Sequence, residues 1–178
     1  MPRYILTGGP GAGKTTLLGA LASLGYATVE ESARAIIAER LDAGMSPRPQ
    51  ATHFAREILR RDIEKYEKTR GVPDSVIFDR GVVEAFGSVQ ENESWPRLEL
   101  ERMLAAYPFD RPVFILPPWP EIYTVDTERD QSFQDAVNVY EKVVKWYSHC
   151  AYPLHEVPCL PVEERAKYVH QVISCRDA

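Results

Sequence analysis

The sequence predicts an α/β fold in which helices cover both faces of a five-stranded parallel sheet. Five short apolar segments alternate with longer segments whose apolar residues recur at helical spacing. The first apolar segment runs into a glycine-rich loop that opens a helix. The chain has 178 residues, of which 44% are hydrophobic and 26% are charged, so we expect one compact domain spanning residues 1–178.

The expected strands are short and continuously apolar, as in a parallel sheet that is buried on both faces. They are residues 3–7, 27–29, 75–78, 113–116 and 154–157. Helices are expected between and after them, at residues 14–24, 33–41, 51–70, 96–106, 131–148 and 162–174. Ser32 is expected to cap the second helix. Residues 81–87 form a glycine-containing segment to which no helix is assigned.

The glycine-rich loop fits the pattern G-x-x-x-x-G-K-[ST], whose chemistry is that of a polyphosphate cradle. Successive backbone N–H groups surround phosphates only where no Cβ blocks close approach, which requires glycine. The helix that follows directs its free N–H groups and its positive dipole end at the same phosphates. The residues expected to bind the nucleotide are Gly8, Gly9, Pro10, Gly11, Ala12, Gly13, Lys14, Thr15 and Thr16.

Two side chains of this loop carry its charge and metal chemistry. Lys14 is expected to reach the β- and γ-phosphates, and Thr15 offers a hydroxyl to Mg²⁺. A glycine-rich turn that binds nothing is the alternative, but this loop follows an apolar strand and opens a helix with leucines in phase. The sequence therefore predicts a nucleoside triphosphate bound with magnesium, with ATP expected and GTP left open.

Asp79 and Arg80 follow the third expected strand. Ligands of an open parallel sheet bind at the carboxyl ends of its strands, so Asp79 is expected to face the same crevice as the loop. A carboxylate there can hold magnesium, directly or through water; the alternative is a strand-end aspartate that caps the next turn. Arg80 is a candidate catalytic residue that contacts a second substrate. The alternative is a surface arginine paired with Asp79 or Glu84.

Glu30 and Glu31 close the second expected strand, and both are expected to point toward the crevice. Glu30 is the candidate catalytic base, which accepts a proton from an acceptor hydroxyl or hydrogen-bonds it. Arg34, one helical turn further on, is expected to orient that carboxylate or to bind substrate. The alternative is that acidic residues are simply favoured at a helix N-terminus by its dipole.

A small lid is expected at about residues 118–130, after the fourth strand. Arg129 is its one basic residue and is the candidate to neutralise charge as the γ-phosphoryl group moves. The alternative is a solvated arginine among neighbouring acidic residues. Trp119 and Tyr123 either stack on a base or pack the lid, and packing is the expectation.

Composition excludes several classes of function. The net charge is -5, the pI is about 5.4, and no basic run of the kind that binds nucleic acid is present. No apolar stretch approaches the ~20 residues that span a bilayer, and no signal peptide precedes the first strand. The three cysteines have no metal-site spacing and are expected to be reduced. A cytoplasmic location is therefore expected.

The chain resembles the small P-loop family of bacterial "predicted ATPases" in the AAA-domain grouping. That grouping also includes ribosylnicotinamide-kinase-like domains and the TRPL translocation defect protein of animals. The resemblance runs nearly end to end and rests on residues 7–16, 30–34, 78–81, 116–123 and 126–129. Residues 116–123 and 126–129 are its most family-specific part, whereas many families share the phosphate loop.

More broadly, the layout is similar to nucleoside and nucleotide kinases. In them a glutamate after the second strand serves as base, and an acidic residue with arginine after the third contacts acceptor or metal. The resemblance implies a three-layer P-loop NTPase fold with strand order 2-3-1-4-5, and it places Glu30, Asp79 and Arg80 at these positions. Kinases that hold a phosphorylated acceptor often use several lid arginines. This lid has one, which argues against a highly phosphorylated acceptor.

The expected function is transfer of the γ-phosphoryl group of ATP to a small hydroxyl-bearing, nucleoside-like acceptor. The alternative is a regulatory binding protein or slow NTPase that uses ATP or GTP and has no small-molecule acceptor. A GTPase-type switch is disfavoured because neither an Asn-Lys-x-Asp guanine reader nor an Asp-x-x-Gly after a strand is present.

Overall fold

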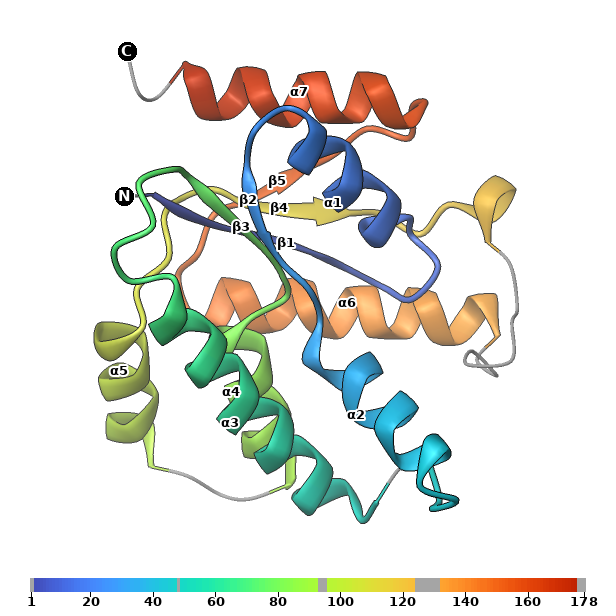
Figure 1. The fold of residues 1–178 in the computed structure, drawn as a ribbon, viewed down its shortest axis with the longest axis vertical. Helices are drawn as coiled ribbons and strands as arrows, with labels where there is room; N and C mark the ends of the chain where they lie inside the picture. Colours follow the sequence, from blue (N-terminus) through green and yellow to red (C-terminus); the bar gives the residue numbers. More distant parts are fainter. Residues whose placement is uncertain (1, 48, 93–95, 124–131, 176–178) are drawn as a thin grey trace.

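Residues 2–47, 49–92, 96–123 and 132–175 are described by the computed structural model of the chain. They contain a five-stranded parallel sheet with the strand order β2-β3-β1-β4-β5 (Figure 1). The strands are β1 (Arg3–Gly8), β2 (Ala27–Val29), β3 (Val76–Asp79), β4 (Val113–Leu116) and β5 (Leu154–Glu156). The predicted fold class and the strand order 2-3-1-4-5 are both confirmed.

Helices connect the strands, as right-handed crossovers in a parallel sheet require. They are α1 (Lys14–Ser23), α2 (Ser32–Asp42), α3 (Ala51–Lys68), α4 (Val82–Asn92), α5 (Arg97–Ala106), α6 (Phe133–His149) and α7 (Val162–Ser174). A 3₁₀ turn, η1 (Pro120–Ile122), follows β4. None of the helices in the described ranges is long and apolar enough to cross a membrane.

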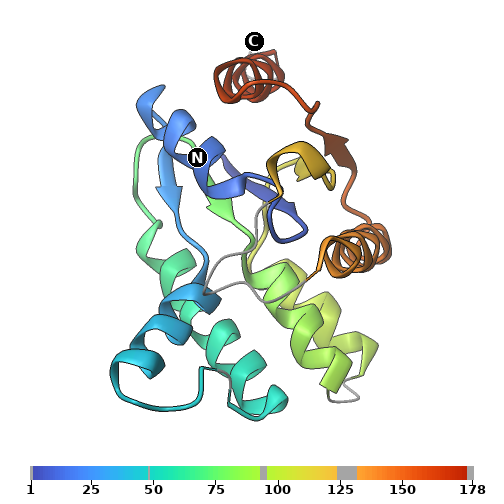
Figure 2. The same cartoon turned by 90° about the vertical axis from the view of Figure 1, so that its right-hand side faces the viewer.

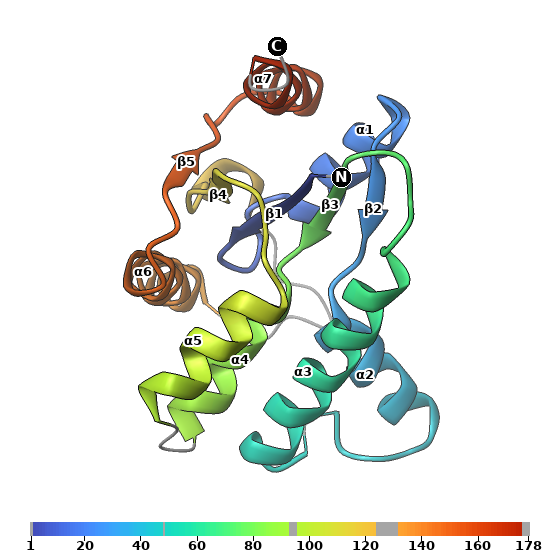
Figure 3. The ribbon, with the colours of Figure 1, turned by 90° about the vertical axis from the view of Figure 1, so that its left-hand side faces the viewer.

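Both faces of the sheet are buried, because successive side chains of a strand point to opposite faces. Tyr4 and Leu6 of β1 belong to one apolar cluster, which α1 and α7 complete. Ile5, between them, belongs to a second cluster with residues of α3, α4 and α6. Figures 2 and 3 show α1 and α7 on one side of the sheet and α3 to α6 on the other.

The register of the strands places three loops side by side. Leu6 of β1 is paired with Asp79 of β3, and Val29 of β2 is paired with Phe78. Because all strands run in one direction, their carboxyl ends meet at one edge of the sheet. The residues after β2 and β3 therefore emerge next to the loop that joins β1 to α1.

One helix was not predicted from the sequence. The glycine-containing segment 81–87, to which no helix was assigned, contains the start of the helix Val82–Asn92. Gly87 lies inside this helix because Trp146 of α6 packs against its backbone, and a Cβ there would come 2.7 Å from the indole ring. The glycine marks a close helix contact rather than a break in the helix.

The prediction that Ser32 caps α2 is wrong. Ser32 is the first residue of the helix, Glu31 is its N-cap, and no side chain caps it. The Ser32 hydroxyl instead donates a hydrogen bond of 2.5 Å to Oδ1 of Asp62 on α3, and both residues are buried. A buried hydroxyl takes the strongest acceptor within reach, and here that is a carboxylate rather than a backbone group.

Candidate active site

The loop between β1 and α1 has the backbone shape that its glycines allow. Gly13, which precedes α1, is left-handed with φ of 82°, a conformation that costs other residues energy. Gly9 lies against α6, where a Cβ would come 2.5 Å from the carbonyl oxygen of Ala136. The loop therefore bends where a left-handed residue is needed and packs where no side chain fits.

Lys14 lies at the centre of this loop. Its side chain is buried, and its Nζ donates hydrogen bonds to the carbonyl oxygens of Gly8 at 3.1 Å and Gly9 at 2.9 Å. Burial lowers the pKa of Lys14 to about 8, and the charge of Arg80 acts in the same direction. The negative charges of Asp79, Glu31 and Glu84 oppose this shift only in part.

Asp79 ends β3 beside this lysine. The residue is 6% exposed, and its Oδ1 is buried with no hydrogen-bond partner among the described residues. Burial raises the pKa of Asp79, and the nearby charge of Lys14 moderates the rise. An unpaired buried carboxylate oxygen is costly unless a ligand satisfies it, so this oxygen fits a site for a hard cation.

A cavity of about 540 Å³ opens at the loop. Its floor is formed by Gly11, Gly13, Lys14, Thr15 and Thr16. Its walls come from distant parts of the chain: Arg34, Trp119, Ile122, Leu160, Pro161, Val162 and Arg165. The volume lies within the range of about 300–1,000 Å³ that is typical of ligand pockets.

Arg165 of α7 closes the far wall of this cavity. It is 5% exposed, its Nη1 lies 3.4 Å from the carbonyl oxygen of Ala12, and its guanidinium lies 5.4 Å from the centre of the Trp119 ring. Its Nε is buried without a partner among the described residues. Nothing in the order of residues marks this arginine, because it lies far from the loop in sequence.

Trp119 and Tyr123 have different surroundings. The Trp119 ring lines the cavity beneath Arg165. Tyr123 packs against the phosphate loop, since a Cβ on Gly11 would come 2.4 Å from its ring. Its ring also meets the Phe133 ring edge-to-face, with 5.4 Å between the ring centres. Tyr123 therefore packs as expected, whereas Trp119 has one side on the cavity.

Arg80 lies under the loop and is held from three directions. Its Nε is 3.0 Å from Oε1 of Glu31, its Nη1 is ion-paired with Glu84, and its Nη2 donates to the Gly8 carbonyl oxygen at 3.2 Å. Its φ of 65° is left-handed, which costs a residue with a side chain about 1–3 kcal/mol. Burial alone would lower the pKa of Arg80, but Glu84, Glu31 and Asp79 outweigh it and keep the guanidinium charged.

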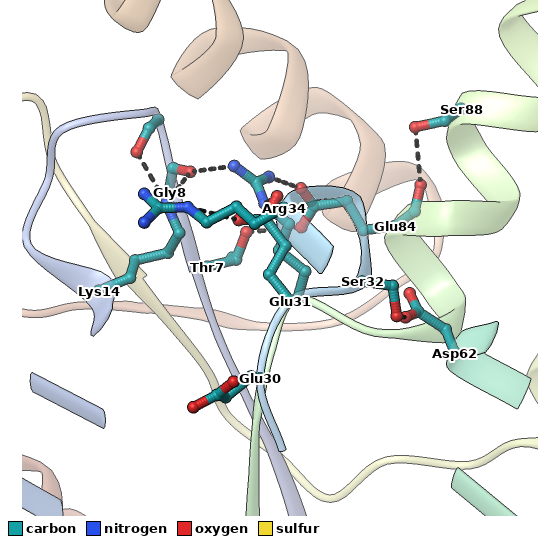
Figure 4. A network of polar contacts seen from close by, with 12 residues as sticks. Thr7, Gly8, Lys14, Glu30, Glu31, Ser32, Arg34, Asp62, Glu84 and Ser88 are labelled. Atoms are coloured by element: carbon teal, nitrogen blue, oxygen red, sulfur yellow. Dashed lines mark hydrogen bonds and ion pairs between the residues drawn. The ribbon is translucent and has the colours of Figure 1, made fainter. Parts of the chain in front are cut away.

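Glu31, rather than Glu30, faces this centre. Figure 4 shows Glu31 within the network of polar contacts, whereas Glu30 stands apart from it. The Glu30 residue is exposed, and the Glu31 side chain is only 17% exposed. The expectation that both point into the crevice is wrong, because neighbouring side chains of an extended segment point to opposite sides.

The carboxylate of Glu31 is ionised at neutral pH. Burial would raise its pKa, but the charges of Arg80, Lys14 and Arg34 outweigh burial and hold the pKa below its usual value. Arg34 contributes through its Nε, 3.7 Å from Oε2 of Glu31, and its side chain is 48% exposed. Arg34 thus contacts Glu31, rather than Glu30, and lines the cavity.

Glu84 of α4 completes the network, and sequence reasoning considered it only as a surface partner of Arg80. Its Oε2 accepts a hydrogen bond of 2.6 Å from the Thr7 hydroxyl and one of 3.4 Å from the Tyr147 hydroxyl. The spacing of Arg80 and Glu84, four residues apart, would have identified the pair if residues 81–87 had been recognised as helical.

The structure thus brings together most of the predicted site residues. Lys14, Asp79 and Arg80 meet at the carboxyl edge of the sheet, and Thr15, Thr16 and Arg34 line the cavity above them. Glu30 lies outside this group. Arg129, with most of the predicted lid, lies outside the described residues.

Comparison with known proteins identifies a family and a fold. A sequence profile of the family described as an AAA domain matches residues 3–165. A search of curated proteins finds no match.

Solved structures with the same fold include two kinases. A shikimate kinase from Acinetobacter baumannii in complex with shikimate has a TM-score of 0.58 and 17% identity, with 99% of this chain and 94% of that chain covered. A deoxyadenosine kinase from M. mycoides with the products dCMP and dCDP bound has a TM-score of 0.65 and 15% identity, with 97% and 99% covered. Identities this low show a shared fold and leave the reaction to be argued from the site.

Proposed function

Because the chain belongs to this AAA-domain family and has a kinase-like P-loop fold, we propose that it is a nucleotide-dependent phosphotransferase. It binds a nucleoside triphosphate with magnesium, ATP in the first instance, and transfers the γ-phosphoryl group to a hydroxyl of a small acceptor. One observation carries the proposal. Lys14, Asp79, Arg80 and Glu31 lie together beneath the phosphate loop, on the edge of the sheet where ligands bind.

The triphosphate end of the nucleotide occupies the loop. The N–H groups between Gly8 and Thr16 and the N-terminus of α1 supply donors, and Lys14 supplies a full charge. When phosphates bind, the Lys14 ammonium exchanges its two carbonyl partners for phosphate oxygens. The rest of the nucleotide fits the 540 Å³ cavity between Trp119 and residues 160–162, where α7 begins.

Thr15 and Asp79 would hold the magnesium ion. Thr15 lines the cavity, and the unpaired Oδ1 of Asp79 at the end of β3 is the kind of hard oxygen that magnesium prefers. No cluster of three or more acidic, histidine or cysteine residues within the described ranges forms a metal cage. Magnesium that binds phosphates needs only one or two protein oxygens, and when bound it neutralises charge on them.

Glu31 is the proposed proton acceptor, in place of Glu30. The acceptor hydroxyl donates to the Glu31 carboxylate and gives up its proton there as its oxygen bonds to the γ-phosphorus. The bond between this phosphorus and the bridging oxygen of the diphosphate breaks, and the nucleoside diphosphate leaves with that electron pair. A carboxylate with a low pKa is a weak base, so its main effect is to orient the hydroxyl, as suits a loose phosphoryl-transfer transition state.

Two arginines have supporting roles in the proposal. Arg80 fixes the orientation of Glu31 and keeps it ionised. Arg34 holds the outer oxygen of Glu31 and faces the phosphate cavity, where it can contact substrate. Arg129 remains the proposed lid residue that neutralises charge on the moving phosphoryl group.

The experiment is an incubation of the protein with Mg-ATP, or Mg-GTP, and a panel of nucleosides and other hydroxyl metabolites. A phosphorylated product detected by mass spectrometry supports the phosphotransferase. The Lys14→Ala variant is the matched control, and it should form no product. Hydrolysis of the triphosphate at a rate that no acceptor changes would instead establish the alternative, a slow NTPase or nucleotide-dependent regulator.

A further inference from the structure

A second cavity, of about 400 Å³, lies between α4 and α6. It shares no lining residue with the phosphate cavity. Its inner end is formed by Arg80 and Glu84, and its walls include Gln90 of α4 with Val139 and Trp146 of α6. The volume exceeds the ~300 Å³ at the lower end of ligand pockets, which is enough for a nucleoside-sized molecule.

The inner end of this cavity adjoins the phosphate loop. Nη2 of Arg80 and Nζ of Lys14 donate to the same carbonyl oxygen, that of Gly8, at 3.2 Å and 3.1 Å. Glu84, which pairs with Arg80, also accepts from Thr7 of β1, one residue before that glycine. A molecule that fills the cavity therefore places its inner end beside the residues proposed to carry out phosphoryl transfer.

The walls of the cavity suit a ring. The Trp146 indole is fixed by a hydrogen bond of 2.8 Å from its Nε1 to the Val83 carbonyl oxygen and by its packing against Gly87. Val139 adds an apolar surface. Aromatic side chains with fixed orientation bind flat rings at little entropic cost, so this wall favours a planar ring over a flexible chain.

Gln90 gives the cavity an oxygen atom that needs a hydrogen-bond donor. Its Oε1 is buried and has no hydrogen-bond partner among the described residues. A buried carbonyl oxygen without a partner costs about 1–3 kcal/mol, which a ligand donor can recover. A ligand with an N–H or O–H group on or near its ring satisfies this atom.

The charges in the cavity disfavour an anion. Its two described cations are Arg80, which is ion-paired with Glu31 and Glu84, and Lys142 at the rim, 3.9 Å from Glu91. An anionic group would face Glu84 and Glu91 and would have to displace one of these pairs. A neutral or cationic ligand meets no such penalty.

We propose that this cavity binds the ring portion of the acceptor, an uncharged or cationic, nucleoside-sized ring compound with a hydrogen-bond donor. This inference rests on the proposed phosphotransferase function and names the substrate class of that site. A phosphate or carboxylate on the acceptor is disfavoured, because Arg80 is already ion-paired with Glu31 and Glu84. The reacting hydroxyl lies at the inner end of the cavity, where Arg80 is paired with Glu31.

The test measures binding and transfer separately. Wild-type protein is titrated by calorimetry with the common nucleosides and with their 5′-monophosphates, and product formation with Mg-ATP is followed in parallel. Val139→Trp fills the cavity with a second indole, and Gln90→Leu removes the unpaired oxygen at nearly constant volume. Glu141→Trp, on the exposed face of the same helix, is the matched control.

We expect at least one nucleoside to bind wild type, and to bind at least roughly tenfold more tightly than its monophosphate. Val139→Trp and Gln90→Leu should weaken that binding about tenfold or more, while the affinity for Mg-ATP and the behaviour of Glu141→Trp stay unchanged. Unchanged Mg-ATP affinity shows that each variant is folded.

Three results overturn the inference. The first is that no nucleoside binds wild type with a dissociation constant below about 1 mM. The others are that Val139→Trp and Gln90→Leu bind the nucleoside as tightly as wild type does, or that wild type prefers the monophosphate. These failures are distinct from failure of the proposed function. Nucleoside binding that Val139→Trp abolishes, without any phosphorylated product, would refute the transferase and keep the pocket. Product formed equally well by Val139→Trp would refute the pocket and keep the transferase.

Discussion

The two halves of the site are built in different ways. The phosphate side is one continuous stretch, Gly8 to Thr16, and its groups are mostly backbone N–H donors shaped by glycine. The acceptor side is made of the side chains of Glu31, Arg80 and Glu84, which come from two separate segments, one after β2 and one after β3. We therefore expect the phosphate side to bind the triphosphate of any nucleotide, and the acceptor side to determine specificity and to depend on the whole fold.

Loss of the phosphate side should have the largest effect. Lys14→Ala removes the only full charge within the loop, and we expect triphosphate affinity and turnover to fall roughly 100- to 1,000-fold. Calorimetric titration with Mg-ATP measures this directly. Lys167→Ala, an exposed lysine of α7, should bind like wild type. Micromolar binding by Lys14→Ala would show that the loop has been wrongly assigned.

The second prediction separates the two halves. Glu31→Gln should lower the rate of transfer about 100-fold, because the neutral amide orients the acceptor hydroxyl less strongly and cannot take up its proton. The dissociation constant of Mg-ATP should stay within about twofold of the wild-type value. Glu30→Gln is the matched control and should retain wild-type turnover, since Glu30 is exposed and faces away. The reverse result, with Glu30 essential and Glu31 dispensable, would show that Glu30 is the proton acceptor.

A smaller effect should appear in the pH dependence of nucleotide binding. The pKa of Lys14 is lowered to about 8 by burial, so the lysine loses its proton as pH rises through that value in the free protein. Bound phosphates favour the charged form, and Mg-ATP affinity should therefore fall about tenfold between pH 7 and pH 9. Lys14→Arg, which stays charged, should bind with a flat profile. A flat profile in wild type would contradict the pKa of Lys14.

The smallest effect concerns how the free energy of unfolding depends on the buried carboxyl group of Asp62, on α3. Burial, together with Glu84 and Glu31, raises the pKa of Asp62 from 3.8 to about 6, although Ser32 and Lys65 oppose the rise. A raised carboxyl pKa contributes stability that is full below pH 3.8 and is lost as pH rises through about 6.

Asp62→Asn tests this contribution, since the amide oxygen still accepts from Ser32 but does not titrate. Between pH 8 and pH 5, wild type should gain about 1 kcal/mol of unfolding free energy relative to the variant, measured by urea denaturation at both pH values. Parallel pH profiles for the two proteins would show that Asp62 has an ordinary pKa.

The same contrast explains what sequence reasoning could reach. The strands and the phosphate loop follow from local pattern, since apolar runs and glycine spacing act within a few residues. Asp79 and Arg80 were found because the carboxyl ends of parallel strands meet at one edge. The choice between Glu30 and Glu31 depends on the phase of a strand only three residues long, which its composition does not determine.

Contacts between distant segments could not be predicted from the sequence. Arg165 reaches Ala12 from a helix whose position depends on packing, and the hydrogen bonds from Thr7 and Tyr147 to Glu84 depend on packing in the same way. The buried pair of Ser32 and Asp62 was missed for a related reason: a serine before an apolar helical pattern indicates a cap, and only tertiary structure shows a carboxylate nearby.

The phosphate loop, near the start of the chain, takes its final shape against elements from the end. Gly9 lies against Ala136, and Ala12 accepts from Arg165. On the ribosome, residues 8–16 are made long before these partners, which at ~5–20 residues per second follow many seconds later. The nascent chain therefore has no finished cradle until residues 136 and 165 have been made, and nucleotide can help its folding only after that point.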